Sequence, residues 1–230
     1  MTPATRRTVK RTTSRAASGT GARGSSGGPG RSARREATRT KLLAAAEQVF
    51  AERGFHGASV EDICERADFT RGAFYSNFSS KEELVLDLLD RHTSGVLERI
   101  AATADNPGLS LEEVLEEVFR AVDDRPTARR QWHLLVSEFE LHALRDAKAG
   151  TAWAKQQRAV RAELGQLVER LAAQRGLRLT VPTAQFVAAA VAIVNAGPAE
   201  ELVEPQPGGT TLARATLPLL VQGSLAPDHR

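Results

Sequence analysis

Apolar positions recur with a helical period along almost the whole chain after residue 36. In the first such stretch, Leu42, Ala46, Val49 and Phe50 follow the i, i+3, i+4, i+7 rule of an amphipathic helix. Gly54 is expected to end this helix as a left-handed cap. No segment shows a convincing alternation of apolar and polar residues. The pattern therefore predicts an all-α fold of about nine helices.

Residues 59–78 contain two short predicted helices joined by a tight turn. Ser59 is a suitable N-cap for the first helix, with Asp62 in its first turn. Thr70 is expected to cap the second helix, whose inward side chains should be Phe74 and Phe78. The other side of this second helix carries polar and basic groups. This arrangement is typical of a helix-turn-helix whose second helix enters the major groove of DNA.

Further helices follow this motif. The run Ser80-Lys81-Glu82-Glu83 reads as a capping box that opens a helix reaching Ala104. About 25 residues would make a rod of roughly 37 Å, long enough to join a head to a separate body. Five further helices are predicted: one from Ser110, one from Thr127 through Trp132 to Leu144, and one that restarts at Gly150-Thr151. The fourth contains the run Phe186–Val194, which is apolar nearly all round and should therefore be buried. The last covers Thr210–Val221, where Pro218 should kink or shorten the helix.

Charge divides the chain unevenly. Residues 1–35 contain nine Lys or Arg and no Asp or Glu, whereas the rest carries 22 basic and 28 acidic residues, a net charge of −6. The first 35 residues are rich in Gly, Ser and Thr, so we expect a disordered basic tail. Such an arm attracts DNA phosphates without reading sequence. The alternative is a solvated extension with no specific role.

Composition excludes several classes of protein. The single cysteine, Cys64, excludes a disulfide framework and a multi-cysteine zinc site, and it fits a reducing cytosol. No apolar segment is long enough to span a bilayer. Arg6-Arg7 could suggest twin-arginine export, but no apolar segment follows this pair, so we expect a cytoplasmic protein. No catalytic or cofactor fingerprint is present, which argues against an enzyme. Glu138 and His142, with His133 nearby, are typical of a surface pair rather than a metal site.

The exposed residues of the second short helix each suit a contact with DNA. Arg71 is the candidate for a bidentate bond to guanine, which is worth about 1–3 kcal/mol of base discrimination. Gly72 and Ala73 allow close approach of the backbone. The full set of candidate DNA contacts is Ser59, Thr70, Arg71, Gly72, Ala73, Tyr75, Ser76, Asn77 and Lys81. In the alternative interpretation this is an ordinary helical bundle, with solvated basic side chains and a tyrosine at the edge of the core.

Residues 37–96 resemble the N-terminal domain of TetR-family (tetracycline-repressor-like) transcriptional regulators. The resemblance lies in the helix from Ala44 to Phe50, in Gly54-Phe55 followed by Ser59-Val60, and above all in the run from Thr70 to Leu84. It implies a helix-turn-helix domain over residues 36–96 and a homodimer with one recognition helix in each major groove. By position, Thr70, Tyr75 and Lys81 resemble the family's phosphate contacts, while Arg71, Gly72, Ala73, Ser76 and Asn77 resemble its groove-facing set. Asp68 departs from the family's usual glycine, but tolerates a left-handed conformation.

The resemblance also implies a ligand-binding and dimerisation domain, here residues 97–225. Candidate walls of a ligand cavity are Phe119, Trp132, Phe139, His142 and Trp153. The resemblance further implies a four-helix dimer interface from the last two helices, here around Thr183–Asn195 and Thr210–Val221. Alanines at 188–190 and 192 would suit such close packing. The alternative for the first of these helices is a core helix of a monomer.

These observations favour a homodimeric repressor that a small-molecule effector releases from a palindromic operator, with no cofactor or metal. Protein symmetry then requires half-sites about 34–36 Å apart, or a related spacing. An activator remains an alternative within this class. Two other interpretations are an architectural DNA binder driven by the basic tail and a helical module for protein interaction.

Overall fold

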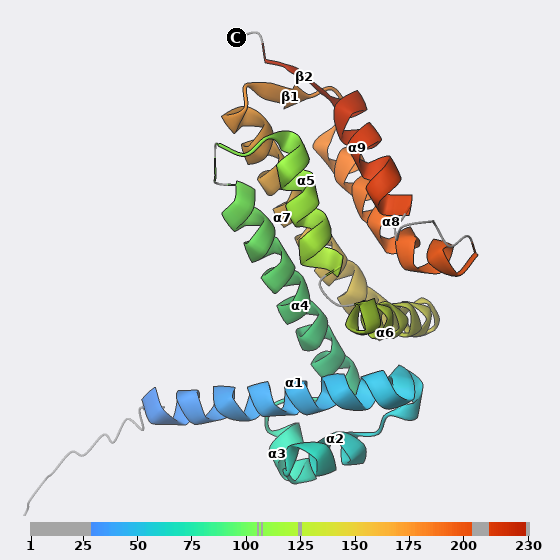
Figure 1. The fold of residues 1–230 in the computed structure, drawn as a ribbon. Helices are drawn as coiled ribbons and strands as arrows, with labels where there is room; N and C mark the ends of the chain where they lie inside the picture. Colours follow the sequence, from blue (N-terminus) through green and yellow to red (C-terminus); the bar gives the residue numbers. More distant parts are fainter. Residues whose placement is uncertain (1–28, 105, 107, 124–125, 204–211, 229–230) are drawn as a thin grey trace, which may run out of the picture.

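The computed structural model describes residues 29–104, 106, 108–123, 126–203 and 212–228. Within this part the chain forms nine α-helices and two short strands (Figure 1), so the predicted helical fold is confirmed. The strands correct the expectation that no strand would form. The elements are α1 (Pro29–Gly57), α2 (Val60–Ala67), α3 (Arg71–Tyr75), α4 (Lys81–Ala104), α5 (Leu111–Asp123), α6 (Pro126–Arg145), α7 (Ala147–Gln174), β1 (Leu177–Leu179), α8 (Thr183–Val203), α9 (Leu212–Ser224) and β2 (Leu225–Pro227).

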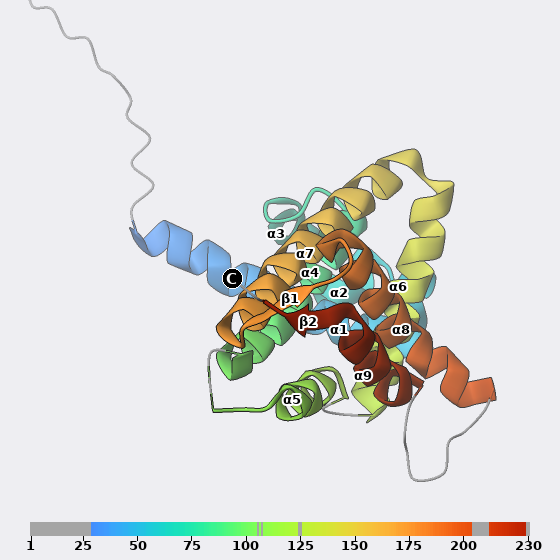
Figure 2. The same ribbon diagram turned by 90° about the horizontal axis from the view of Figure 1, so that it is seen from above.

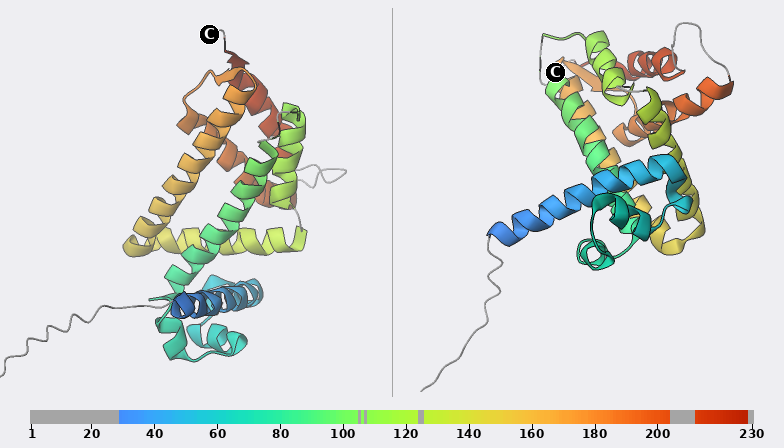
Figure 3. Two further views of the ribbon diagram at one scale, coloured as in Figure 1. Left: turned by 90° about the vertical axis from the view of Figure 1, so that its left-hand side faces the viewer. Right: turned by 60° about the horizontal axis from the view of Figure 1, so that its bottom comes forward.

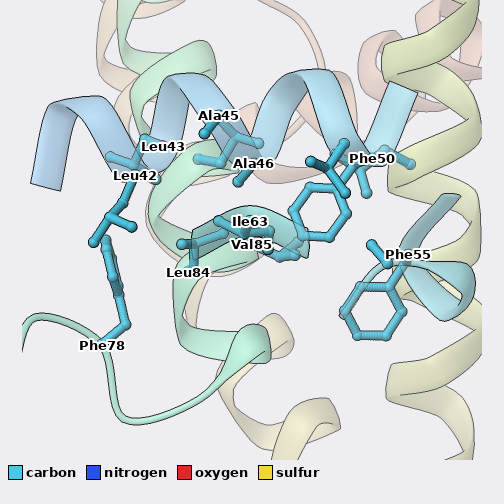
Figure 4. Packing of buried hydrophobic residues seen from close by; sticks show 14 of the residues in the cluster. Leu42, Leu43, Ala45, Ala46, Phe50, Phe55, Ile63, Phe78, Leu84 and Val85 are labelled. Carbon is cyan, nitrogen blue, oxygen red and sulfur yellow. The ribbon is translucent and has the colours of Figure 1, made fainter. Parts of the chain in front are cut away.

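The head consists of α1, α2, α3 and the first turns of α4 around one apolar core. Leu42, Ile63 and Leu84, from three different helices, are completely buried. Figure 4 shows these side chains converging between α1 and α4. The same core includes Leu135 and Phe139 of α6, so the head is packed directly against the body. Burial of this cluster is what fixes the orientation of α2 and α3.

Helix α1 differs from the prediction at both ends. It begins at Pro29, so residues 29–35, assigned above to a disordered tail, are helical. Three Arg and one Ala among these seven residues are strong helix formers, which favours the longer helix. Residues 1–28 lie outside the described part. At the other end Gly54 has φ 69° and ψ 175°, a conformation essentially restricted to glycine, and not the left-handed helical cap that was expected.

The body is built on two long helices that rise away from the head. In Figure 3, α4 and α7 form two sides of a triangle whose base is α6. The rod predicted from Ser80 is confirmed as α4, with Leu84 and Ile100 of its apolar stripe buried. Its capping box is confirmed in part: the Ser80 hydroxyl accepts from the Glu83 N–H (3.2 Å), but the Glu83 carboxylate accepts from the backbone N–H of Ser79 (2.7 Å) instead of that of Ser80.

The break between α6 and α7 does not lie at Gly150-Thr151. Asp146 caps α7, accepting a hydrogen bond from the Ala149 N–H (2.7 Å), and Gly150 lies inside the helix. A Cβ atom at Gly150 would lie 2.6 Å from the carbonyl oxygen of Ala143 on α6. Glycine here permits close contact between the two helices and does not interrupt either of them.

Helices α8 and α9 pack against each other on one side of the body, as Figures 1 and 2 show. Phe186 and Val187 are buried, but Ala192 is exposed, so the prediction that the whole run 186–194 is buried is wrong. Pro218 lies inside α9, which continues to Ser224. Strands β1 and β2 pair antiparallel, with Leu179 opposite Leu225, and join the end of α7 to the segment after α9. None of the described helices has the length and hydropathy of a bilayer-spanning segment.

Candidate DNA-binding surface and ligand cavity

Helix α3 is short, and its two faces differ sharply. Phe74 is fully buried and packs on Phe78, which anchors the helix to the head. Thr70 is the N-cap, as predicted, and its hydroxyl accepts from the Ala73 N–H (3.2 Å). On the opposite face the Tyr75 side chain is 50% exposed. The buried anchor therefore presents the other face of α3 to solvent.

Helix α2 is closed at both ends by its own residues. The Ser59 hydroxyl accepts from the Asp62 N–H (3.1 Å), and the Asp62 carboxylate accepts from the Ser59 N–H (2.9 Å). The hydrogen bonds from the Ser59 hydroxyl and backbone hold the pKa of Asp62 below its usual range. Asp68 ends the helix in the left-handed conformation, with φ 56°, as expected for the turn. Ser59, a candidate DNA contact, is thus the N-cap of α2.

Arg71 is exposed at the start of α3, but it is not free. Its guanidinium forms an ion pair with Glu61 of α2 (2.8 Å) and lies 5.9 Å from the centre of the Tyr75 ring. Gly72 and Ser76 are exposed beside it. The Arg71 guanidinium, the Tyr75 phenol and the Ser76 hydroxyl are therefore grouped on one open face. Glu61 partly neutralises the charge of Arg71 when no binding partner occupies this face.

Two candidate DNA contacts have internal roles instead. Asn77 was expected to face the groove, but it is buried, and its amide donates to the Ala73 carbonyl (2.8 Å). Its backbone carbonyl accepts from Arg39 (2.8 Å). A side-chain amide can donate to the carbonyls at the end of a helix that have no backbone partner. Because the Asn77 amide donates in this way, its side chain is not part of the exposed face of α3.

Lys81 likewise differs from the predicted phosphate contact. Its ammonium donates to the carbonyls of Phe55 and Ala58 (both 2.7 Å) and lies 4.4 Å from the centre of the Phe55 ring. Burial lowers the pKa of this lysine. The side chain therefore links the first turn of α4 to the chain that leaves α1.

A contact between head and body, which we call the joint, is formed by Gly54, Phe55, Glu138, Phe139 and His142. The Glu138 carboxylate accepts from the Phe55 N–H (2.5 Å), and a Cβ at Gly54 would lie 2.7 Å from the same carboxylate. The His142 ring lies 5.0 Å from that of Phe55, and the Phe139 ring 5.3 Å. The i, i+4 spacing of Glu138 and His142 indicated a shared face of α6, but the sequence did not reveal its partner.

The body contains a cavity of about 890 Å³ that is lined mainly by residues of α4 to α9, and Glu47 and Ala51 of α1 also line it. Phe119, Trp132 and Trp153 line it, in agreement with their selection from the sequence. Phe139 and His142 do not, because they belong to the joint; for these two the prediction is wrong. His92 stacks on Trp132 at 3.8 Å, and burial lowers its pKa. Sequence reasoning missed His92 and the polar cavity residues Gln156 and Arg175.

The head matches a known family of regulators. The sequence profile of "Bacterial regulatory proteins, tetR family" matches residues 42–88. The chain is 42% identical over 76 residues to the transcriptional activator FasR of Mycolicibacterium smegmatis, and 32% identical over 88 residues to the transcriptional repressor DhaR of a Mycobacterium species. The structure of GusR from Salmonella enterica has the same fold, with a TM-score of 0.58 at 24% identity, over 81% of this chain and 94% of that one. The head therefore resembles that of the TetR family of bacterial regulatory proteins.

The sequence similarity to FasR and DhaR is confined to part of their length. The alignments cover 31% of this chain and 35% of FasR, and 38% of this chain and 44% of DhaR. The fold extends further: the fatty acid degradation regulator FadR of Bacillus halodurans matches with a TM-score of 0.60 at 17% identity, over 80% of this chain and 93% of that one. The similarity in fold thus extends over about four fifths of the chain, whereas the sequence alignments with FasR and DhaR cover 31% and 38% of it.

Proposed function

We propose that this protein is a homodimeric transcriptional repressor that binds a palindromic operator through α3 and is released by a small molecule in the body cavity. It would act in the cytoplasm, bound to DNA. The observation that carries the proposal is the open face of α3, where Arg71, Tyr75 and Ser76 are exposed on a helix anchored by a buried phenylalanine. The match of residues 42–88 to the TetR family of bacterial regulatory proteins supports the same conclusion.

The proposed DNA contacts are now fewer than the sequence suggested. Thr70, Arg71, Gly72, Ala73, Tyr75 and Ser76 lie on or at the ends of α3 and remain candidates. Arg71 would exchange its ion pair with Glu61 for two hydrogen bonds to guanine, since both nitrogens of its fork fit the guanine edge. Thr70 and Tyr75 would bind flanking phosphates and set the register.

Helix α6 supports a route from ligand to DNA. Trp132, Leu135 and Val136 line the cavity, while Glu138 and Phe139, on the next turn, belong to the joint. A ligand that favours a shifted α6 would displace the head, because the Glu138–Phe55 hydrogen bond and the shared core connect the two. The ligand must prefer the conformation in which the two heads no longer match the operator.

The face of α8 and α9 supports dimerisation. Leu219 is 66% exposed and Leu212 40% exposed on α9, and Ala192 is exposed on α8. Small and apolar groups on two adjacent antiparallel helices suit a four-helix interface with a second copy. Such a pair would present two α3 helices related by a two-fold axis.

Selection of bound sequences from random duplex DNA with the purified protein is the experiment that tests this function. We expect a palindromic consensus, and we expect Arg71→Ala to relax the preference at one base position in each half-site. Recovery of no consensus would refute sequence-specific binding. Equal loss of affinity for every sequence by Arg71→Ala would contradict the assignment of Arg71 to a base.

A deletion separates this function from architectural binding by the basic tail. The deletion must stop at residue 28, because α1 begins at Pro29. Without residues 1–28 the protein should keep its operator preference and lose part of its non-specific affinity. Loss of the preference together with all DNA binding would favour the architectural alternative. In a reporter strain, deletion of the gene should raise transcription from the operator; a fall would indicate an activator.

A further inference from the structure

The cavity is long. Its wall on α7 begins at Trp153, near the head, and ends at Arg175, a span of about 33 Å at the helical rise of 1.5 Å per residue. An extended ligand fills such a space better than a compact one.

The middle of the cavity is largely apolar, although the lining also includes Arg99, Arg158 and Arg161. Its lining from α4, α5, α7 and α8 includes Leu97, Val114, Val118, Val160, Leu164, Leu167, Leu171, Phe186 and Val191. A hydrocarbon chain placed there removes apolar surface from water on both sides, which is favourable in proportion to the buried area. Most of the ligand's length should therefore be apolar.

The two ends of the cavity differ in charge. Its lining carboxylates, Glu47 of α1 and Glu140 of α6, belong to helices at the head end. The opposite end carries Arg175, whose guanidinium donates to the carbonyls of Leu171 (3.3 Å) and Leu109 (3.2 Å). Its Nε–H is buried without a hydrogen-bond partner. None of the ion pairs found among the described residues includes Arg175.

We propose that the cavity binds an elongated anionic amphiphile, with its acid group at Arg175 and its chain directed toward Trp132 and Trp153. The two carbonyls already hold the guanidinium in place, so the ligand would gain a charge-assisted hydrogen bond to a pre-oriented donor. The acid would also satisfy a buried donor that otherwise lacks a partner. This inference rests on the proposed function, since it names the chemical class of the effector.

Chain length follows from the same geometry. The two tryptophans lie at the end of the cavity nearest the joint, next to the part of α6 that contacts the head. A short acid would reach Arg175 but would leave that end empty. Only a long chain would contact both Arg175 and α6.

Intrinsic fluorescence provides a direct test, because Trp132 and Trp153 are the only tryptophans of the chain and both line the cavity. The full-length protein is titrated with dodecanoate, hexanoate and dodecyltrimethylammonium, each below its micellar concentration. Dodecanoate should give a saturable change at one molecule per chain, and the other two should bind at least about tenfold more weakly. Equal binding of dodecanoate and dodecyltrimethylammonium, or no binding of dodecanoate, would overturn the proposal.

Variants of Arg175 test the position of the acid. Arg175→Gln should weaken dodecanoate about tenfold and leave the neutral 1-dodecanol unchanged, whereas Arg175→Lys should retain part of the affinity. Arg170→Gln, an exposed position of α7 outside the cavity, is the control and should bind as the parent does. Circular dichroism checks the fold of each variant. If dodecanoate and 1-dodecanol weaken together, or if Arg175→Gln binds like Arg170→Gln, Arg175 does not receive the acid.

These titrations need no DNA, so they stand apart from the test of the proposed function. A mobility-shift assay on the selected operator then asks whether dodecanoate releases the protein. Tight, Arg175-dependent binding without release would support the site and refute the effector role. Release of the parent protein but not of Arg175→Gln would support both.

Discussion

At the scale of single residues, the ion pair between Glu61 and Arg71 is expected to restrain DNA binding. The carboxylate occupies the guanidinium and adds negative charge beside the proposed path of the phosphates. Replacing Glu61 by Gln should therefore raise operator affinity about threefold, within the range that exposed ion pairs contribute. Glu65→Gln is the matched control, since it removes the same charge from α2 without freeing Arg71. Mobility-shift titrations at two salt concentrations would measure both; an equal gain from both variants would indicate only a general charge effect.

Asp62 provides a prediction on pH. Its pKa is lowered in the folded state, chiefly by hydrogen bonds from Ser59, so the folded protein favours the carboxylate more than the unfolded chain does. That contribution to stability is present above the unfolded pKa of about 3.9 and is lost as the pH falls through the lower, folded pKa. The difference in free energy of unfolding between the parent and Asp62→Asn should therefore be largest near neutral pH and shrink in acid. Urea unfolding at several pH values measures it, and a difference independent of pH would contradict this account.

At the scale of elements, the close contact of α6 with α7 depends on Gly150. A methyl group there would meet the Ala143 carbonyl at 2.6 Å, so Gly150→Ala must separate the helices. We expect a loss of about 1–3 kcal/mol in the free energy of unfolding, the usual cost of overpacking. A methyl group at Gly95, within α4, would meet no neighbouring side chain or helix within 4 Å, so Gly95→Ala should instead gain about 0.5–1 kcal/mol. Denaturant unfolding of the two variants should give opposite signs.

The same elements show how far the sequence could predict this structure. The helix-turn-helix was predictable because its determinants are local: Ser59 and Thr70 cap their helices, and Phe74 is inward at the expected spacing. The joint was not, because the Phe55–Glu138 hydrogen bond connects residues 83 positions apart. The position of a lysine in the sequence also does not show whether its ammonium binds a DNA phosphate or donates to backbone carbonyls. Lys81 was therefore assigned to DNA, whereas in the structure it donates to two carbonyls.

Other errors arose where two local signals competed. Asp146 and Gly150 are both common at helix ends, and only the packing of α7 on α6 decides that the glycine is internal. Phe139 and His142 are large, apolar or amphipathic residues on a helix that has two buried sides. Periodicity showed that they face inward, but not whether they meet the cavity or the head. Their neighbour Trp132, on the same helix, lines the cavity.

At the scale of the whole molecule, the proposed dimer makes DNA affinity dependent on a surface far from α3. Leu219 of α9 is 66% exposed in the single chain, and a second copy packed on α8 and α9 would cover it. Leu219→Glu would place a charge in that interface, where burial without a partner costs several kcal/mol. We therefore expect a monomer by analytical ultracentrifugation and loss of most operator affinity, because one head cannot engage two half-sites.

Leu144→Glu is the control for this change. Leu144 is even more exposed, at 79%, but it lies on α6, away from the α8–α9 face. The variant should therefore remain dimeric and bind the operator as the parent does, although it adds the same charge to the surface. A dimeric Leu219→Glu protein would place the interface elsewhere. A monomeric Leu219→Glu protein with undiminished operator affinity would show that a single α3 suffices, and the two-fold arrangement of heads would have to be abandoned.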